Sequence, residues 1–97
     1  YMASKLQGTI TEITPEGDLI TDLVADRLSA APSDERLRVL VDEEHETFGL
    51  FASNHTQPPM TLIAILDSGQ PLKLHLVGDS AAAMLGVRCG APVSVEW

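Results

Sequence analysis

Apolar and polar residues alternate with a period of two in three stretches of the chain. The stretches are residues 37–42, 72–76 and 93–97, and in each of them apolar side chains occupy every second position. In the second stretch, the leucines alternate with Lys73 and His75. Successive side chains of a strand point to opposite faces, so this pattern predicts strands that pack on a core with one face.

Four further stretches have a composition typical of strands. Residues 6–14 and 18–24 are rich in Thr, Ile and Leu, and the cluster Pro15-Glu16-Gly17-Asp18 between them favours a turn, so we expect a hairpin. Residues 44–51 continue with residues that strands tolerate. Residues 62–66 are apolar on both faces, which predicts a central strand of a sheet.

A short helix is expected near the end of the chain. The pair Asp79-Ser80 can cap a helix by accepting backbone N–H bonds, residues 81–85 are good helix formers, and Gly86 supplies a left-handed stop. Residues 25–34 predict a short helical turn followed by a loop, and residues 53–59, with two prolines, predict a loop.

These elements together predict a mainly β domain with one short helix near the C-terminus. Six or seven short strands separated by turns favour a closed or nearly closed barrel over an open sheet with exposed edges. A chain of 97 residues is long enough for one core and one domain. We expect this domain to cover residues 6–97, and residues 1–5 to be a remnant of an expression tag or a disordered N-terminus.

The acidic composition bears on the choice of partner. Fourteen Asp and Glu residues against six Lys and Arg give a formal net charge of -8, so the average surface repels phosphate backbones and anionic lipids. The longest apolar run, residues 60–66, is far shorter than the roughly 20 residues that a membrane-spanning helix needs. We therefore expect neither nucleic acid nor a membrane as a partner.

The single cysteine and the N-terminal sequence favour a cytoplasmic location. Cys89 cannot form a disulfide within the chain, and no basic segment followed by an apolar stretch marks a secretory signal. A nucleophilic thiol needs a neighbouring base and an electropositive pocket. We favour the interpretation of Cys89 as a small, half-buried residue in the turn before the last strand.

Residues 42–46, Asp-Glu-Glu-His-Glu, form the densest polar cluster of the chain. Carboxylates together with a histidine can bind a divalent metal, but neighbouring side chains on a strand point to opposite faces, so a solvated turn is the favoured interpretation. The spacing of His45, His55 and His75 relative to Cys89 does not match a zinc site. We expect no metal and no resident cofactor.

Two separated strings carry a resemblance to a known family. The first is residues 8–23, with Gly17-Asp18 and Thr21-Asp22 at its centre, and the second runs from Asp67-Ser68-Gly69 through Ser80-Ala81-Ala82 to Val95. In order and spacing they resemble the C-terminal domain of the S-adenosylmethionine (SAM) hydroxide adenosyltransferase and fluorinase/chlorinase family. The resemblance covers residues 6–97, although residues 25–59 match only in general character.

The resemblance implies a Greek-key barrel that contributes adenine and methionine contacts, while a larger α/β domain carries the reaction chemistry. Family enzymes are trimers that bind the ligand between two subunits. The implied ligand-binding candidates here are the following residues: Asp18, Asp22, Asp67, Ser68, Gly69, Ser80, Ala81 and Ala82. Asp18 replaces the family's adenine-binding Asn, and an ionised Asp only accepts hydrogen bonds. The family acid that binds the methionine amino group falls near Ile13 or Thr14, neither of which is a carboxylate.

Three functional hypotheses follow from these observations. The first is a non-catalytic barrel module for ligand binding or assembly, with adenosine or SAM as the candidate ligand and a homo-oligomer as the expected state. The second is a partner subunit that completes a SAM-cleaving active site with a separately encoded α/β chain. The third is a protein-interaction domain without a small ligand.

Overall fold

The strands follow the predicted alternation closely. The computed structural model describes residues 4–28, 31–32, 34–52, 55–67 and 69–97. Within these ranges the strands are β1 Lys5–Ile13, β2 Leu19–Val24, β3 Arg38–Val41, β4 His45–Phe48, β5 Leu62–Ile65, β6 Pro71–Leu76 and β7 Pro92–Glu96. The 3-10 turn η1 covers Ala25–Leu28, and the helix α1 covers Ala81–Leu85. The hairpin β1–β2, the helix and the last strand all lie where the sequence predicts them.

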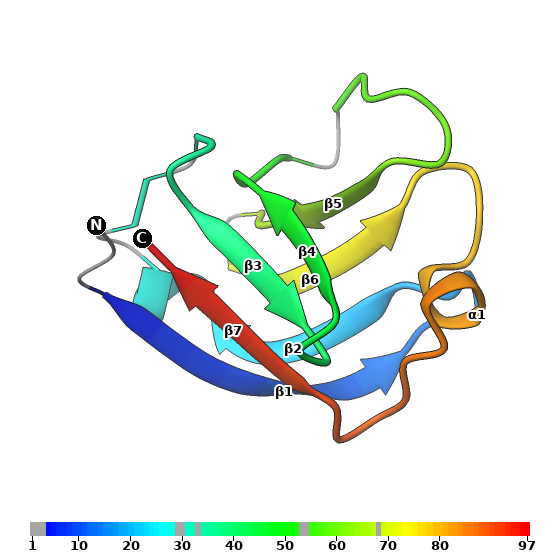
Figure 1. Cartoon of the computed structure of the whole chain (residues 1–97), viewed down its shortest axis with the longest axis horizontal. Coiled ribbons are helices and arrows are strands. Elements are labelled where there is room, and N and C mark those ends of the chain that lie inside the picture. The colour runs from blue at the N-terminus through cyan, green and yellow to red at the C-terminus, as the bar shows by residue number, and fades with distance from the viewer. Residues whose placement is uncertain (1–3, 29–30, 33, 53–54, 68) are drawn as a thin grey trace.

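The strands form a nearly closed antiparallel barrel with Greek-key order (Figure 1). The order is β4-β3-β7-β1-β2-β6-β5, which places the last strand between β3 and β1. Strand β1 turns the corner of the barrel: Lys5 to Thr9 pair with β7, and Ile10 to Ile13 pair with β2, with a break in register between Ile10 and Glu12. Such a bulge lets one strand belong to two halves of a barrel.

The core is built from the inward-facing residues of both halves. All of the following are buried: Ile10, Leu19, Leu23, Val39, Val41, Leu72, Leu74, Val93 and Val95. The hydroxyl of Thr21, also buried, donates to the carbonyl of Leu72 at 2.8 Å and so satisfies its only side-chain donor. The two end strands approach each other where the Thr47 hydroxyl donates to the Leu62 carbonyl at 2.8 Å.

The prediction that residues 62–66 form a central strand was wrong. Strand β5 lies at one end of the sheet order. Its outer face is nevertheless buried, with Ile63 and Ile65 at 1% and 4% exposure, because the chain after β4 returns along it. The N–H of Phe51 donates to the carbonyl of Ala64 at 2.9 Å, and the N–H of Leu66 donates to that of Phe51 at 2.9 Å. A covering segment therefore produced the apolar pattern that we attributed to a neighbouring strand.

Hydrogen bonds fix the helix and also join Ser4 to Trp97. Ser80 caps α1 by accepting from the N–H of Ala83 at 3.1 Å, and Gly86 ends the helix with φ 69°. Ser4 and Trp97 exchange two backbone hydrogen bonds of 3.0 and 3.1 Å, so the ordered domain begins before the predicted residue 6. Over the described ranges, the structure contains no helix of sufficient length and apolarity to span a membrane.

Candidate functional site beside the Gly17 turn

The turn between β1 and β2 lies against the start of α1. Gly17 adopts φ 92°, and its N–H donates to the carbonyl of Thr14 at 2.8 Å. The carbonyl of Gly17 accepts from the N–H of Ala82 at 2.9 Å, and a Cβ at Gly17 would overlap Ser80. Two strings that are 63 residues or more apart in the sequence are thus in contact, through Gly17 on one side and Ser80 and Ala82 on the other.

Asp18 is the buried charge of this region. Its side chain is 12% exposed, and one carboxylate oxygen lies 2.6 Å from Nδ1 of His75. The other oxygen lies 3.9 Å from Nζ of Lys73. Leu19 pairs with Leu74 in the β2–β6 ladder, so Asp18 is brought opposite His75 by strand register alone.

The pairing with Asp18 fixes the hydrogen-bonding role of His75. A carboxylate only accepts, so Nδ1 of His75 is the donor, and in a neutral ring Nε2 is then an acceptor. The ring of His55 lies beside it, with centroids 5.8 Å apart and planes tilted by 52°. Nδ1 of His55 accepts from the N–H of Gln57 at 3.1 Å, which fixes the position of this second ring.

A cavity of about 460 Å³ opens on the same half of the barrel. Its polar lining comes from Glu12, Thr14, Asp67, Gln70 and Lys73, and its apolar lining from Ile20, Ile65 and Pro71. Two of these residues also contact residue 18: the Thr14 hydroxyl accepts from the Asp18 N–H at 3.0 Å, and Lys73 pairs with the Asp18 carboxylate. The volume lies within the range typical of small-molecule sites.

The structure brings together only part of the predicted ligand-binding set. Asp67 lines the cavity, and Asp18 contacts two of its lining residues, Thr14 and Lys73. Asp22 is not among the lining residues, and its carboxylate accepts from the N–H of Thr9 at 3.0 Å. Four residues at about 3.3 Å each place Asp22 about 13 Å along the chain from Asp18. Gly69 is exposed and lines a smaller neighbouring hollow of about 160 Å³. Ser68 lies outside the described residues.

The three candidates at the start of α1 have separate roles. Ala81 is fully buried and belongs to the hydrophobic core. Ala82 is half-buried and its N–H is used by the Gly17 carbonyl. Ser80 is half-buried and its hydroxyl caps the helix. These contacts fix the position of the Gly17 turn, and the backbone N–H of Ala82 and hydroxyl of Ser80 are therefore already engaged.

Sequence reasoning missed His75, Lys73 and His55 as members of this site. The first two appeared only as the polar positions of an alternating strand, and His55 lay in a predicted loop. A possible signal was the register of the two strands: once Leu19 and Leu74 are paired as inward-facing residues, His75 must lie near Asp18. That pairing spans 55 residues and needs the strand order, which the sequence pattern does not supply.

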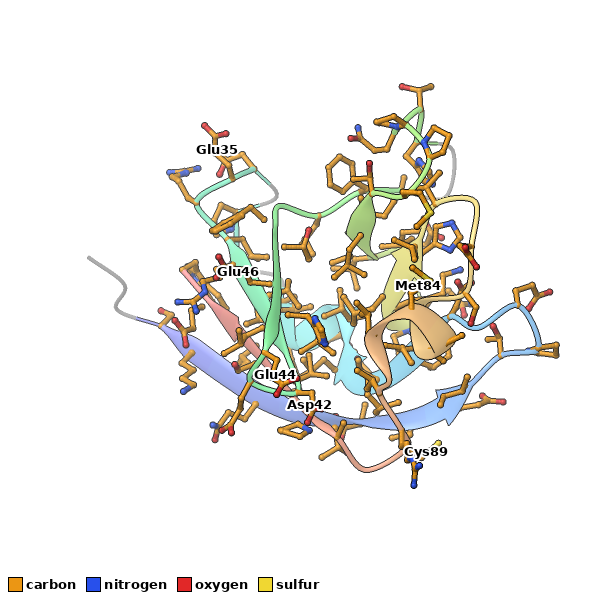
Figure 2. All side chains as sticks on the ribbon, turned by 45° about the vertical axis from the view of Figure 1, so that its right-hand side comes forward. Glu35, Asp42, Glu44, Glu46, Met84 and Cys89 are labelled. Atoms are coloured by element: carbon orange, nitrogen blue, oxygen red, sulfur yellow. The ribbon has the colours of Figure 1, made fainter. Side chains whose placement is uncertain are left out.

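Two other candidate chemistries are placed elsewhere. Cys89 is exposed in the turn before β7, so the expectation of a half-buried residue was wrong (Figure 2). The acidic cluster forms the tight β3–β4 turn, with Asp42 and Glu43 at φ 54° and 59°. Figure 2 shows Asp42 and Glu44 at this solvated turn. Within the described part of the chain, no three His, Cys, Asp or Glu side chains are arranged to bind a metal ion.

Comparisons with known proteins identify the fold. No protein-family model matches the chain, and no curated protein matches it. Among solved structures, an uncharacterized conserved protein from Thermotoga maritima is similar, with a TM-score of 0.72 and 20% identity over 98% of this chain. A conserved hypothetical protein from Thermus thermophilus is similar over 92% of this chain, with a TM-score of 0.67 and 21% identity.

These similarities concern the barrel alone. At 20% and 21% identity they establish a shared fold and do not assign a family. This chain spans only 38% of the first structure and 32% of the second. In both of those proteins the barrel is therefore one part of a chain more than twice as long.

Proposed function

We propose that this barrel is a non-catalytic binding module whose site is the cavity beside Asp18, with an adenosine-type ligand as its occupant. The sequence resemblance to the adenine-binding half of SAM-cleaving enzymes motivates the choice of ligand class. The observation that carries the proposal is the 460 Å³ cavity, because two of its lining residues, Thr14 and Lys73, contact Asp18, the position onto which the family's adenine contact falls. A cytoplasmic location and a homo-oligomeric state belong to the same proposal.

The chemistry of the cavity supports a ligand with both an aromatic body and polar groups. Ile20, Ile65 and Pro71 provide apolar surface for a flat ring, while Thr14 and Gln70 provide donors and acceptors at its edge. Asp18 is already engaged with His75, so a ligand reaches its carboxylate only through the oxygen that faces Lys73. The half-open cavity leaves part of a nucleoside exposed.

A second candidate function is favoured by the length of the similar structures. Both are chains in which the barrel accounts for about a third of the length. A site left partly open on the barrel is consistent with completion by an α/β domain, either on a separate chain or elsewhere in the same protein. In that case the barrel supplies ligand contacts to a SAM-cleaving reaction and the other domain supplies the reacting groups.

The test is thermal unfolding with increasing adenosine or SAM. A ligand at 100 times its dissociation constant adds about 2.7 kcal/mol to the free energy of unfolding, which raises the melting temperature by roughly 10 °C or more. Adenine N7 is an acceptor that an Asn amide can satisfy and a carboxylate repels. Asp18→Asn should therefore tighten adenosine binding.

Asp22→Asn is the matched control for this experiment. It makes the same change of charge at a residue that is bound to Thr9 and does not line the cavity. Adenosine affinity should be unchanged in this variant. Absence of any thermal shift in the native chain and in Asp18→Asn would refute the ligand proposal and favour a protein-interaction domain.

A further inference from the structure

The other half of the barrel is formed by the four strands β1, β7, β3 and β4, which lie side by side (Figure 1). Residues that pair directly across antiparallel strands lie on the same face. The register places four such residues in one row across β1, β7, β3 and β4: Lys5, Glu96, Arg38 and Phe48. The next row contains Gln7, Ser94, Leu40 and Glu46.

The first row alternates in charge and ends in an aromatic ring. Lys5 lies 3.7 Å from one Glu96 oxygen, and the guanidinium of Arg38 lies 3.8 Å from the other. Phe48, at the free end of the row, is 47% exposed, an unusual degree for a Phe side chain. From β1 to β4 the row is therefore positive, negative, positive and aromatic, and this order of side chains indicates which partner the face can bind.

Arg38 has unused hydrogen-bonding capacity. Its Nε atom is buried and lies 2.9 Å from Glu46, yet no group among the described residues accepts a hydrogen bond from it in good geometry. The contact of its guanidinium with Glu96 is long for a charge-assisted hydrogen bond, which is typically 2.7–2.9 Å. The Nε atom is out of reach of a second molecule, but the side chain is 33% exposed, so a carboxylate approaching from outside would bind the terminal N–H groups of the guanidinium.

A two-fold axis parallel to the strands, between β7 and β3, makes this row complementary to itself. Such an axis exchanges the first strand of the face with the fourth and the second with the third. Each Glu96 then faces the Arg38 of the other copy, and each Lys5 faces the exposed Phe48 ring. The first pair is an ion pair and the second is a cation–π contact.

The second row is compatible with the same arrangement. Under this axis Gln7 faces Glu46, and Ser94 faces Leu40, so no two like charges meet. A hollow of about 270 Å³ next to Ser94 and Gln7 leaves space for the side chains of a facing sheet. Sheets packed face to face lie about 10 Å apart with their strands within roughly 30°, which keeps these pairs within reach.

We propose that this face binds a second copy of the same chain in a symmetric dimer. The charge pattern selects this occupant, because it is the complement of its own two-fold image. Four strands at about 4.8 Å and five residues at about 3.3 Å give a flat face of roughly 19 by 17 Å, or about 650 Å² for two copies, which is below the area of stable specific interfaces. The dimer is therefore weak and reversible, and it does not depend on the ligand proposed for the opposite half.

The test is sedimentation of the whole chain over a wide concentration range. The native chain should show a monomer–dimer equilibrium. Arg38→Glu and Glu96→Arg should each raise the dissociation constant at least tenfold, because each places two pairs of like charges across the axis. A one-to-one mixture of the two variants should associate again as a heterodimer, since every cross pair is then opposite in charge.

Matched charge changes away from the face serve as controls. Arg88→Glu alters the net charge as Arg38→Glu does, and Glu35→Arg as Glu96→Arg does, at exposed positions outside both rows. These controls should leave the equilibrium unchanged. Phe48→Ser, a substitution at an exposed position, tests the face if the charge variants unfold, and it should weaken the dimer several-fold.

The outcomes separate clearly. Dimerisation that Phe48→Ser weakens and that the mixed variants recover supports the proposal. A chain that remains monomeric at millimolar concentration, or a dimer that neither Phe48→Ser nor Arg38→Glu affects, overturns it.

Discussion

The two outer faces of the barrel use charged residues in opposite ways. On the β2–β6 half, the Asp18 side chain is 12% exposed and lies 2.6 Å from His75. On the β1–β7 half, Lys5 is 52% exposed and lies 3.7 Å from Glu96. Both pairs come from the polar positions of alternating strands, so sequence period alone does not distinguish them.

The difference comes from what covers each face. Phe51 hydrogen-bonds with Ala64 and Leu66, and the ring of His55 lies beside that of His75, while the Gly17 turn packs on Ser80. Charges under such a cover lose water and need partners that stay in place. The charges of the open face keep their water, so each of their pairs contributes little to the stability of the single chain.

Gly17→Ala should produce the largest loss of stability, because it disrupts the packing of the Gly17 turn on Ser80. Alanine at φ 92° is strained, and its Cβ would overlap Ser80. We expect a loss of about 2–4 kcal/mol in the free energy of unfolding. Gly90→Ala is the control: it has the same φ of 92° but nothing within 4 Å of the added Cβ, so it should cost only about 1–2 kcal/mol.

Urea unfolding of both variants measures this difference. Equal losses for Gly17→Ala and Gly90→Ala would show that the contact with Ser80 contributes nothing beyond backbone strain. In that case the Gly17 turn would not be tightly packed on Ser80, and burial beneath this turn could not explain the difference between the two faces.

His75→Ala should have the next largest effect. It leaves the buried Asp18 carboxylate with only Lys73, at 3.9 Å, and an incompletely paired buried charge costs about 1–3 kcal/mol. Lys5→Ala on the open face should cost less than about 0.5 kcal/mol. Chemical unfolding at low protein concentration, where the chain is monomeric, measures both.

The double variant Asp18→Ala/His75→Ala sharpens this measurement. Removing both partners eliminates the buried charge, so the double variant should lose clearly less than the sum of the single losses. Additive losses would contradict a direct interaction between the two side chains. The same cycle on Lys5 and Glu96 should be additive within about 0.5 kcal/mol.

The fold was largely predictable, because it depends on local patterns. The leucines of 72–76 and the valines near the end alternate as strand residues do, and each lies in the core where expected. The helix from Ala81 to Leu85 was predicted from its cap and its glycine stop. The error at β5 arose because its outer side chains Ile63 and Ile65 are buried although the strand ends the sheet, and because Phe51, outside any regular strand, pairs with Ile65.

The candidate site was predictable only in part, because it depends on contacts between distant segments. Asp18 entered through the family resemblance, but its partner His75 lies 57 residues away and is reached only through strand register. Asp22 was also selected through the family resemblance, but strand geometry places it about 13 Å from Asp18. A resemblance of short motifs therefore selected Asp18 as a candidate without indicating which side chains contact it.

Arg36→Gln should have the smallest effect, although the pair it breaks is shorter than that of Lys5 and Glu96. Arg36 Nε lies 3.0 Å from Asp34, and the side chains are 75% and 57% exposed. The hydrogen bond from Arg36 holds the pKa of Asp34 below its ordinary value. A lowered carboxyl pKa stabilises the fold above the ordinary pKa, and this contribution disappears as the pH falls through the lowered value.

The substitution should therefore move the pKa of Asp34 upward toward its ordinary value, which carbon NMR of the carboxyl group can follow. The melting temperature at neutral pH should stay unchanged, since solvent screens a pair that is this exposed. Arg27→Gln, another exposed arginine, is the control and should leave the pKa of Asp34 where it is. A measurable drop in melting temperature for Arg36→Gln would mean that the distance between the charged atoms, rather than their burial, determines how much an ion pair stabilises the fold. The difference in energy between the ion pairs of the two faces would then need another cause.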